Sequence, residues 1–271
     1  MGLEAGEIIK RLEKTTVIYT DVDGTFVSEG GLFKNRHGYT LNNARAIQLL
    51  LEKGVDVVMT SGREKETMHS TARLLGFQNY IANLGIEIVY DQGKRVISNF
   101  GAEVETQAGL KSWIEESGVV KAIFKEFPGK SRYYLPWSEG LRTHHLLIGE
   151  LEFEKVQKLV DEAFPEIRII DNGAVSPNGE FRRPHAYHIL PRRVGKKAAV
   201  ALDKNERHLS TCNLIGIGDS MEDESIAPEV AVFFLLDEMV EARHDNVVRV
   251  NNRDGEGFSR IIDFLNRENF L

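Results

Sequence analysis

The sequence predicts an α/β protein with a Rossmann-like, mostly parallel sheet at its core and an inserted α+β domain. Apolar runs at 17–20, 55–59 and 213–217 each end in polar residues, which is typical of buried parallel strands. Helical patterns alternate with these runs, as they do in crossover units. The pattern changes after Gly85 and returns near residue 185. We therefore expect a core made of 1–85 and 185–271 and an insert over 86–184.

The composition fits one large or two medium-sized domains with a hydrophobic core, because 42% of the 271 residues are hydrophobic. A net charge of −7 argues against nucleic acid or an anionic membrane as the partner, since Lys and Arg hold those surfaces. No apolar run approaches the roughly 20 residues of a membrane span, and the charged start does not fit a signal peptide. A cytoplasmic protein is expected. The single cysteine, Cys212, excludes an internal disulfide and a Cys-rich zinc site.

The elements of the core follow from hydrophobic periodicity. The pattern over 41–53 predicts a helix whose buried face is formed by Leu41, Ala44, Ile47 and Leu51. A second helix over 64–76 buries Met68, Ala72 and Leu75 and ends at Gly76. Later segments predict a helix from Gly195, strands near 213, 230 and 247, and a closing helix from Gly257.

The insert has shorter, mixed elements. A hairpin is predicted around 91–93, a helix over 104–117, and a strand, a helix and a strand over 143–170. The irregular, basic and aromatic stretch over 124–140 is predicted to be a specificity loop.

Polar motifs follow three of the predicted core strands. They are Asp-Val-Asp-Gly-Thr at 21–25, Thr-Ser-Gly-Arg at 60–63 and Gly-Asp-Ser-Met-Glu-Asp at 218–223. The carboxyl ends of parallel strands lie along one edge of a sheet, so we expect these motifs to converge there.

Such convergence would gather several carboxylates, which is costly unless a cation neutralises them. Hard oxygen ligands without Cys or His indicate Mg²⁺, held by Asp21, Asp23 and Asp219. Mg²⁺ completes its shell with water and phosphate oxygens, so a phosphate ester is the expected substrate. Asp21 is then the candidate nucleophile and Asp23 the candidate acid/base.

A transferred phosphoryl group also needs hydrogen-bond donors and a cation. Ser61 and the backbone of Gly62 are candidates. Lys196 and Lys197 stand at the start of a predicted helix, where a cation opposes the helix dipole unless an anion is bound. The alternative, two solvated lysines, stays open on pattern alone.

Taken together, the three motifs and "VGKKAA" at 194–199 resemble the four motifs of the haloacid dehalogenase superfamily of phosphohydrolases. The insert resembles the large α/β cap of the branch with Cof-like, sucrose-phosphate and mannosyl-3-phosphoglycerate phosphatases. The resemblance implies a core with an inserted cap and a Mg²⁺-dependent phosphatase that uses an aspartyl-phosphate intermediate. It also implies roles for single residues, with Asp21 as nucleophile, Asp23 as acid/base, Ser61 and Lys196 on the phosphate, and Asp219 and Asp223 at the metal.

Two positions depart from the family pattern. Many members carry Asn where this chain has Glu222, and an Asn-Gly pair where it has Leu84 and Gly85. An extra carboxylate at 222 would repel the phosphate, bind metal or point away. Lys197 stands where many members have Gly.

The resemblance implies that the cap supplies substrate contacts, so its basic residues are candidates. We expect substrate contacts from Arg132, Arg142, His144, Arg183 and His185 in the insert, and from Arg63 in the core. Strand neighbours point to opposite faces, so only one of His144 and His145 can face a cleft. The expected partner is a small phosphorylated metabolite, either a sugar phosphate or a glycosyl-phosphoglycerate, and the expected assembly is a monomer or homodimer.

Three other functions stay open on the sequence. A phosphosugar mutase would use the same aspartyl-phosphate and return it to sugar. A glycosyltransferase also combines an Asp-x-Asp motif with a metal, but that motif generally follows a nucleotide-binding unit. The remaining alternative is a non-catalytic phosphometabolite-binding protein on the same fold. It stays open because Glu222 departs from the family pattern.

Overall fold

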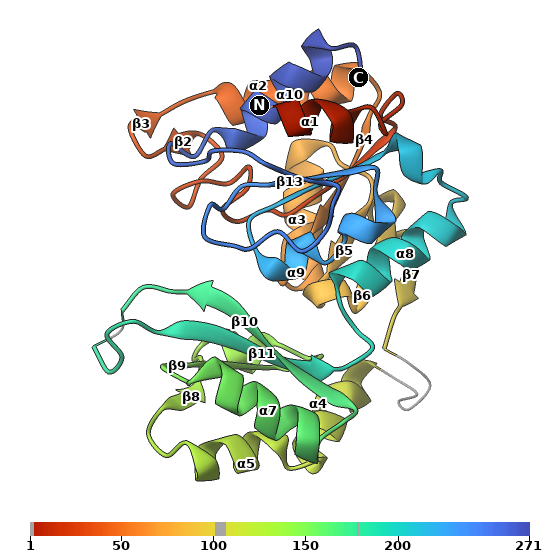
Figure 1. Cartoon of the computed structure of the whole chain (residues 1–271). Helices are drawn as coiled ribbons and strands as arrows, with labels where there is room; N and C mark the ends of the chain where they lie inside the picture. Colours follow the sequence, from red (N-terminus) through yellow and green to blue (C-terminus); the bar gives the residue numbers. More distant parts are fainter. Residues whose placement is uncertain (1–2, 101–106, 178) are drawn as a thin grey trace. The chain divides into compact units, whose positions relative to one another are not determined.

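The computed structural model describes residues 3–100, 107–177 and 179–271, and the chain divides into two compact units. The first unit comprises 1–97 and 195–271, and the second comprises 98–194 (Figure 1). The sequence pattern placed the two junctions about ten residues earlier, at 85 and 185. The elements at the junctions explain the difference.

The first unit is built on an eight-stranded sheet with the order β14-β13-β12-β1-β4-β5-β6-β7. Its neighbours from β14 to β5 pair in parallel, whereas β5 and β6 are antiparallel. A small hairpin follows the first strand. The strands of this unit are β1 (Val17–Thr20), β2 (Lys34–Asn35), β3 (Gly38–Tyr39), β4 (Asp56–Thr60), β5 (Tyr80–Ala82), β6 (Glu87–Tyr90), β7 (Arg95–Ser98), β12 (Leu214–Gly218), β13 (Val232–Leu235) and β14 (Val247–Arg249).

Helices cover both faces of this sheet. The first face packs against α1 (Leu3–Ile9), α2 (Asn42–Glu52), α3 (Lys65–Leu75) and α10 (Gly257–Arg267). Figure 1 shows α2 and α10 side by side. The second face packs against α8 (Lys196–Glu206) and the short turns near α9 (Met221–Glu224). Because alternate strand residues serve opposite faces, the central strands are apolar on both sides.

The junctions show why the predicted boundaries were early. The strands β6 and β7, joined by a short turn at Asp91–Gly93, extend the large sheet instead of opening the insert. The segment from His185 to Pro191, predicted to return to the core, is strand β11 of the second unit and pairs with β9 and β10 there. Sequence periodicity does not tell which sheet an apolar strand joins.

The helix α2 turns a different face to the core from the predicted one. Asn43, Ala46, Ile47 and Leu50 are its buried residues, and only Ile47 belongs to the predicted set. Leu41 and Leu51 are largely exposed. By contrast, α3 buries Met68 and Ala72 as predicted and ends at Gly76, whose φ of 78° gives a left-handed cap.

The second unit is a four-stranded antiparallel sheet with helices on one face. Its strand order is β10-β11-β9-β8, and Figure 1 shows α4, α5 and α7 on the same side of it. The stretch over 124–140 is not an irregular loop, because it contains β8 and α6. Of the helix predicted over 104–117, residues 104–106 lie outside the described residues. The elements are α4 (Gln107–Glu116), α5 (Val119–Glu126), β8 (Ser131–Tyr133), α6 (Trp137–Gly140), β9 (His145–Gly149), α7 (Phe153–Ala163), β10 (Ile167–Ala174) and β11 (His185–Pro191).

A buried histidine pair lies at the sheet face opposite these helices. His144 Nε2 and His188 Nδ1 are 2.8 Å apart, and the other ring nitrogen of His144 lies 3.0 Å from Thr143 Oγ1. Burial lowers the pKa of His144 well below its usual value, and the nearby His188 and His145 lower it further. Both rings of the pair are buried. The pair therefore favours the neutral form of His144.

We expect the unfolding free energy of this protein to fall as pH drops below about 6.5. The unfolded chain then binds a proton at His144 that the folded chain excludes, so this group stabilises the fold above pH 6.5 and loses that contribution on acidification. The slope for one histidine is at most about 1.4 kcal/mol per pH unit. Urea denaturation between pH 5 and 7.5 measures it. His144→Gln should flatten the curve, and the exposed control His37→Gln should not; equal curves for all three proteins would rule out this role of His144.

Among the described residues, none of the helices combines the length and apolar character needed to cross a membrane.

Candidate active site

The three polar motifs meet at one edge of the large sheet, as predicted. The strand β1 lies between β12 and β4 and is parallel to both. Thr20, its last residue, is in register with Ile217 and Met59. The loops that follow these strands therefore leave the sheet side by side.

Three carboxylates gather where these loops begin. Asp21, Asp219 and Asp223 each offer an oxygen, and these oxygens lie within 4.8 Å of one another. Asp21 and Asp223 are buried, and Asp219 is half-buried. Burial, and next the charge of Asp223, raise the pKa of Asp219 to about 7 against the opposing charge of Lys196. Burial likewise raises the pKa of Asp21, although Lys196 partly offsets this.

A single buried lysine lies within this group. Lys196 Nζ donates to Asp21 Oδ1 at 2.7 Å and to Asp223 Oδ1 at 2.5 Å. Burial alone would lower the pKa of Lys196, but the charges of Asp21 and Asp223 outweigh burial and raise it. Lys197 is exposed on the next position of α8. The structure thus distinguishes two lysines that the pattern alone left equivalent.

Asp223 is held on both carboxylate oxygens. Besides the contact of Oδ1 with Lys196, its Oδ2 accepts hydrogen bonds from the backbone and hydroxyl of Ser220 at 3.1 and 2.6 Å. Ser220 Oγ accepts in return from the backbone N–H of Asp223, which makes a capping box at the start of α9. These contacts fix Asp223 and, through it, the amino group of Lys196.

The side chain of Asp23 lies outside the carboxylate group. Arg63 forms a two-pronged ion pair with it, Nε to Oδ2 at 2.7 Å and Nη2 to Oδ1 at 2.5 Å. More than half of the Asp23 side chain is exposed, and that of Arg63 is about one-third exposed. The Asp23 carboxylate, expected among the metal ligands, therefore does not join the other three. Arg63, predicted as a substrate contact, pairs with Asp23, and its role toward a substrate stays a prediction.

Ser61 and Gly62 are held in a tight loop after β4. The backbone of Ser61 donates to Ile81 and accepts from Leu84, both at 3.0 Å, and its hydroxyl accepts from the backbone N–H of Arg63 at 3.2 Å. Ser61 is buried and Gly62 is half-buried. Both lie on the loop predicted for phosphate binding, and their role there stays a prediction.

The loop at Asn83, Leu84 and Gly85 packs against the start of α8, which carries Lys196. The sequence had given this loop no role in the site. All three have positive φ, which is uncommon for Asn and rarer for Leu. A Cβ at Gly85 would lie 2.3 Å from the carbonyl oxygen of Gly195, the residue before α8. The departure from an Asn-Gly pair thus keeps the glycine, which this close approach requires. Positive φ at two consecutive non-glycine residues leaves no readable signal in the sequence.

Gly24 is pressed against the metal-ligand candidate Asp219. Its φ is 80°, and a Cβ built on it would lie 1.9 Å from Asp219 Oδ2. Its backbone carbonyl accepts from Asn252 Nδ2 at 2.9 Å, which fixes the turn. The backbone therefore approaches this carboxylate as only glycine permits.

For the phosphatase activity that the motifs predict, we expect Gly24→Ala to lower phosphate release by about 10²-fold, because a displacement near 1 Å in a catalytic group has an effect of that size. Gly30→Ala is the matched control, since Gly30 has a φ of 75° and no atom lies within 4 Å of the place that a Cβ would take there. Gly30→Ala should lower the unfolding free energy through the same backbone strain, but it should leave phosphate release unchanged. Equal activity losses in the two variants would show that backbone strain, not the displacement of Asp219, is responsible.

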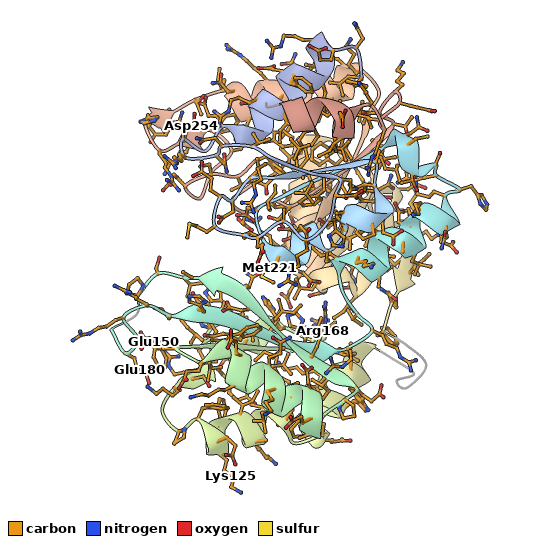
Figure 2. The ribbon with its side chains drawn as sticks, viewed as in Figure 1. Lys125, Glu150, Arg168, Glu180, Met221 and Asp254 are labelled. Carbon is orange, nitrogen blue, oxygen red and sulfur yellow. The ribbon has the colours of Figure 1, made fainter. Side chains whose placement is uncertain are left out.

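The basic residues expected to bind substrate in the second unit do not form one group. Arg132 pairs with Glu180 at 2.5 Å, His185 pairs with Asp171 at 2.7 Å, and His144 pairs with His188. Arg142 and Arg183 have exposed side chains. A further basic residue of this sheet is Arg168, labelled in Figure 2. It lies on β10, next to the strand β11 that carries His188, and the sequence did not single it out. Their roles toward a substrate stay predictions.

The opposite orientation expected for His144 and His145 is observed. His144 and His188 lie on the sheet face away from the helices, whereas Tyr187 belongs to the apolar cluster under them. His145 lies on the helix side, with Nε2 at 3.3 Å from the backbone oxygen of Lys111. Only one of the two adjacent histidines is thus available to the helix-free face.

The residues at the sheet edge fit a divalent cation. The candidate ligands are all carboxylate oxygens, which Mg²⁺ prefers, and no Cys or His belongs to this described group. Burial and then the charge of Asp223 raise the pKa of Asp219 more than Lys196 lowers it. Asp21 and Asp219 are the residues best placed to hold the ion, because both oxygens of Asp223 already accept hydrogen bonds within the protein.

Comparison with known families identifies this arrangement. The family model of haloacid dehalogenase-like hydrolases matches residues 18–136, which include β1, β4 and the motifs that follow them. This stretch, a little under half of the chain, is similar to the haloacid dehalogenase-like hydrolases. No curated protein matches the sequence. The large, mostly parallel sheet and the second, antiparallel sheet match the fold of a haloacid dehalogenase-like core with a cap.

Solved structures with this haloacid dehalogenase-like fold match nearly the whole chain. A Thermoplasma acidophilum protein, 0175, has a TM-score of 0.67 and 16% identity, over 96% of this chain and 100% of its own. BT1666 from Bacteroides thetaiotaomicron, described among phosphatases of the superfamily, has a TM-score of 0.64 and 16% identity, over 96% and 97%. The sucrose-phosphatase of Synechocystis sp. PCC6803, solved with sucrose and phosphate, has a TM-score of 0.63 and 13% identity, over 96% and 100%. At these identities the likeness concerns the fold.

Proposed function

We propose that this protein is a Mg²⁺-dependent phosphatase that hydrolyses a small phosphorylated metabolite through an aspartyl-phosphate on Asp21. The observation that carries the proposal is the contact of Lys196 Nζ with Asp21 Oδ1, 2.7 Å long and buried, beside Asp219 and Asp223. A buried carboxylate beside a buried cation at the carboxyl edge of a parallel sheet suits attack on an anionic phosphoryl group.

Asp21 is the nucleophile in this proposal. Its carboxylate attacks phosphorus and displaces the alcohol of the substrate, and water later releases phosphate from the acyl phosphate. Lys196 lies beside the attacking group and stabilises the charge on the phosphoryl oxygens. Ser61 and the backbone of Gly62 supply further donors from the loop after β4. The family match and the phosphatase among the structural relatives support this assignment.

Asp23 is the proposed acid/base. It protonates the leaving oxygen and then takes a proton from the attacking water. Its ion pair with Arg63 must loosen or turn for this work, since both oxygens of Asp23 now accept from the guanidinium. Arg63 thereby holds Asp23 beside the carboxylate group until a substrate phosphate competes for the guanidinium.

Asp21 and Asp219 would hold Mg²⁺, with Asp223 as their support. When bound, the ion supplies charge neutralisation to the phosphoryl group and to the clustered carboxylates. The fixed backbone of Gly24 keeps Asp219 in place for this role.

The substrate class is proposed from the cap and the structural relatives. A sucrose-phosphatase with sucrose and phosphate bound shares the fold, which favours a phosphorylated sugar or glycoside. The proposed substrate contacts in the second unit are Arg132, Arg142, His144, Arg183 and His185. The arginines among them would pair with the carboxylate of a glycosyl-phosphoglycerate.

A test measures phosphate release from a panel of sugar phosphates and phosphoglycerate glycosides, with Mg²⁺ and with EDTA. We expect turnover with Mg²⁺ and a loss of at least about 10²-fold when EDTA removes it. Transfer of labelled phosphate to sugar without release would instead indicate a mutase. Binding without turnover of any panel member, in folded protein with Mg²⁺, would indicate a non-catalytic phosphometabolite-binding protein.

A further inference from the structure

We propose that Glu222 is a positioning residue that holds the backbone of Lys196, so that two consecutive acids fix this lysine at both ends. Glu222 stands where many members of the superfamily have Asn, and the sequence left its role open. The catalytic part of this role rests on the proposed function, in which Lys196 serves the reaction. The contact itself is a feature of the fold.

The Glu222 side chain is directed at the start of α8. Glu222 Oε1 accepts a hydrogen bond from the backbone N–H of Lys196 at 3.1 Å. Lys196 is the first residue of α8, and the residue before it is Gly195, which offers no side-chain cap. The first N–H groups of a helix need such acceptors, and a carboxylate there also interacts favourably with the helix dipole. Glu222 thus supplies, from another element, the cap that α8 lacks.

The next residue holds the other end of the same lysine. Asp223 Oδ1 accepts from Lys196 Nζ at 2.5 Å, and its Oδ2 is fixed by the capping box of Ser220. Both acids belong to α9, whose first residue, Met221, is labelled in Figure 2. One short helix therefore binds the backbone N–H and the side-chain amino group of Lys196 at once.

Two other roles for Glu222, metal binding and repulsion of the phosphate, do not fit its contacts. Within the described residues, the candidate metal ligands are Asp21, Asp219 and Asp223, and Glu222 is not among them. Glu222 is half-buried, and its carboxylate accepts from the start of α8. The backbone of Gly195 also lies so close to Gly85 that a Cβ on Gly85 would overlap it. The start of α8 is thus held by both Gly85 and Glu222.

The fixed helix start matters for the proposed reaction. A lysine side chain has a flexible stem, so its amino group is placed well only if the backbone that carries it is fixed. Asp223 attracts the amino group whatever the position of the helix start. Glu222 fixes the helix start, and the two contacts together place Nζ beside Asp21 Oδ1. Loss of Glu222 should reduce the rate of the chemical step more than it weakens substrate binding.

Three variants separate this role from a charge effect. Glu222→Gln keeps an oxygen that accepts a hydrogen bond, Glu222→Ala removes it, and Glu241→Ala removes the same charge from an exposed position of the same unit. With Mg²⁺ and p-nitrophenyl phosphate, we expect Glu222→Ala to lower kcat about 10- to 100-fold with KM changed less than about threefold. Glu222→Gln and Glu241→Ala should stay within about threefold of wild type.

Hydrogen exchange gives a readout that does not depend on activity. The peptide that contains the N–H of Lys196 should exchange faster in Glu222→Ala than in wild type, and Glu222→Gln should restore slow exchange. If exchange follows this order but no variant or wild type releases phosphate, the contact stands and the proposed function fails. Equal exchange in all proteins, or a Gln variant as impaired as Ala, would overturn the inference. So would a lower KM in both Glu222 variants, since that would place the carboxylate against the substrate phosphate.

Discussion

Replacing Asp21 with Asn is expected to reduce phosphate release by at least about 10³-fold, because an amide does not form the acyl phosphate on which the proposed reaction depends. Asn has nearly the same shape as Asp, so the packing at the end of β1 is kept. Lys196 also retains its contact with Asp223 in this variant. The measurement is kcat for phosphate release with saturating Mg²⁺, alongside circular dichroism to verify the fold.

The Asp23→Asn variant distinguishes the role of Asp23 as acid/base from the role of Asp21 as nucleophile. It should still form the acyl phosphate on Asp21 from an activated substrate, whose leaving group needs no proton, and then hydrolyse it slowly. Asp21→Asn should form none. An Asp21→Asn protein that keeps a tenth or more of wild-type activity would place the nucleophile elsewhere.

Lys196→Ala should have the second-largest effect, on both activity and stability. Its removal leaves the buried carboxylates of Asp21 and Asp223 without their cation, which typically costs about 3–5 kcal/mol of unfolding free energy in a buried pair. Activity should fall about 10²- to 10³-fold, as expected when a group that stabilises transition-state charge is lost. Urea denaturation and phosphate release measure the two effects.

Mg²⁺ and the neighbouring lysine provide the controls for this variant. Added Mg²⁺ should restore part of the lost stability, since it supplies positive charge to the same carboxylates. Lys197→Ala, one position along α8 and exposed, should change neither stability nor activity appreciably. A Lys197→Ala variant as impaired as Lys196→Ala would show that the buried contacts of Lys196 are not the cause of the effect.

Much of the fold was predictable because its signals are local. The apolar runs that end in Asp21, Ser61 and Asp219 predicted both the parallel strands and the shared edge at which their loops meet. Membership of an element in one sheet or the other was not predictable. The strands β6 and β11 carry similar apolar patterns, yet β6 joins the large sheet and β11 the small one, since tertiary pairing decides between them.

The site was predictable in its residues and less so in its contacts. Asp21, Asp219, Asp223 and Lys196 come together as expected. The pairing of Asp23 with Arg63 and the direction of Glu222 depend on rotamers that no sequence pattern encodes. The predicted buried face of α2 was wrong because it left out Asn43. This polar side chain is buried and donates hydrogen bonds to the backbone oxygens of Phe26 and Gly255, which a hydrophobic pattern cannot predict.

Trapping the acyl phosphate decides whether Asp21 attacks phosphorus. Wild-type protein is mixed with Mg²⁺ and p-nitrophenyl phosphate, quenched in acid within the first turnovers, digested and sequenced by mass spectrometry. We predict a phosphorylated peptide with the modification on Asp21, absent with EDTA and in Asp21→Asn. Phosphate release with Mg²⁺ accompanied by an unmodified Asp21, or by modification of another residue, would refute the proposed nucleophile.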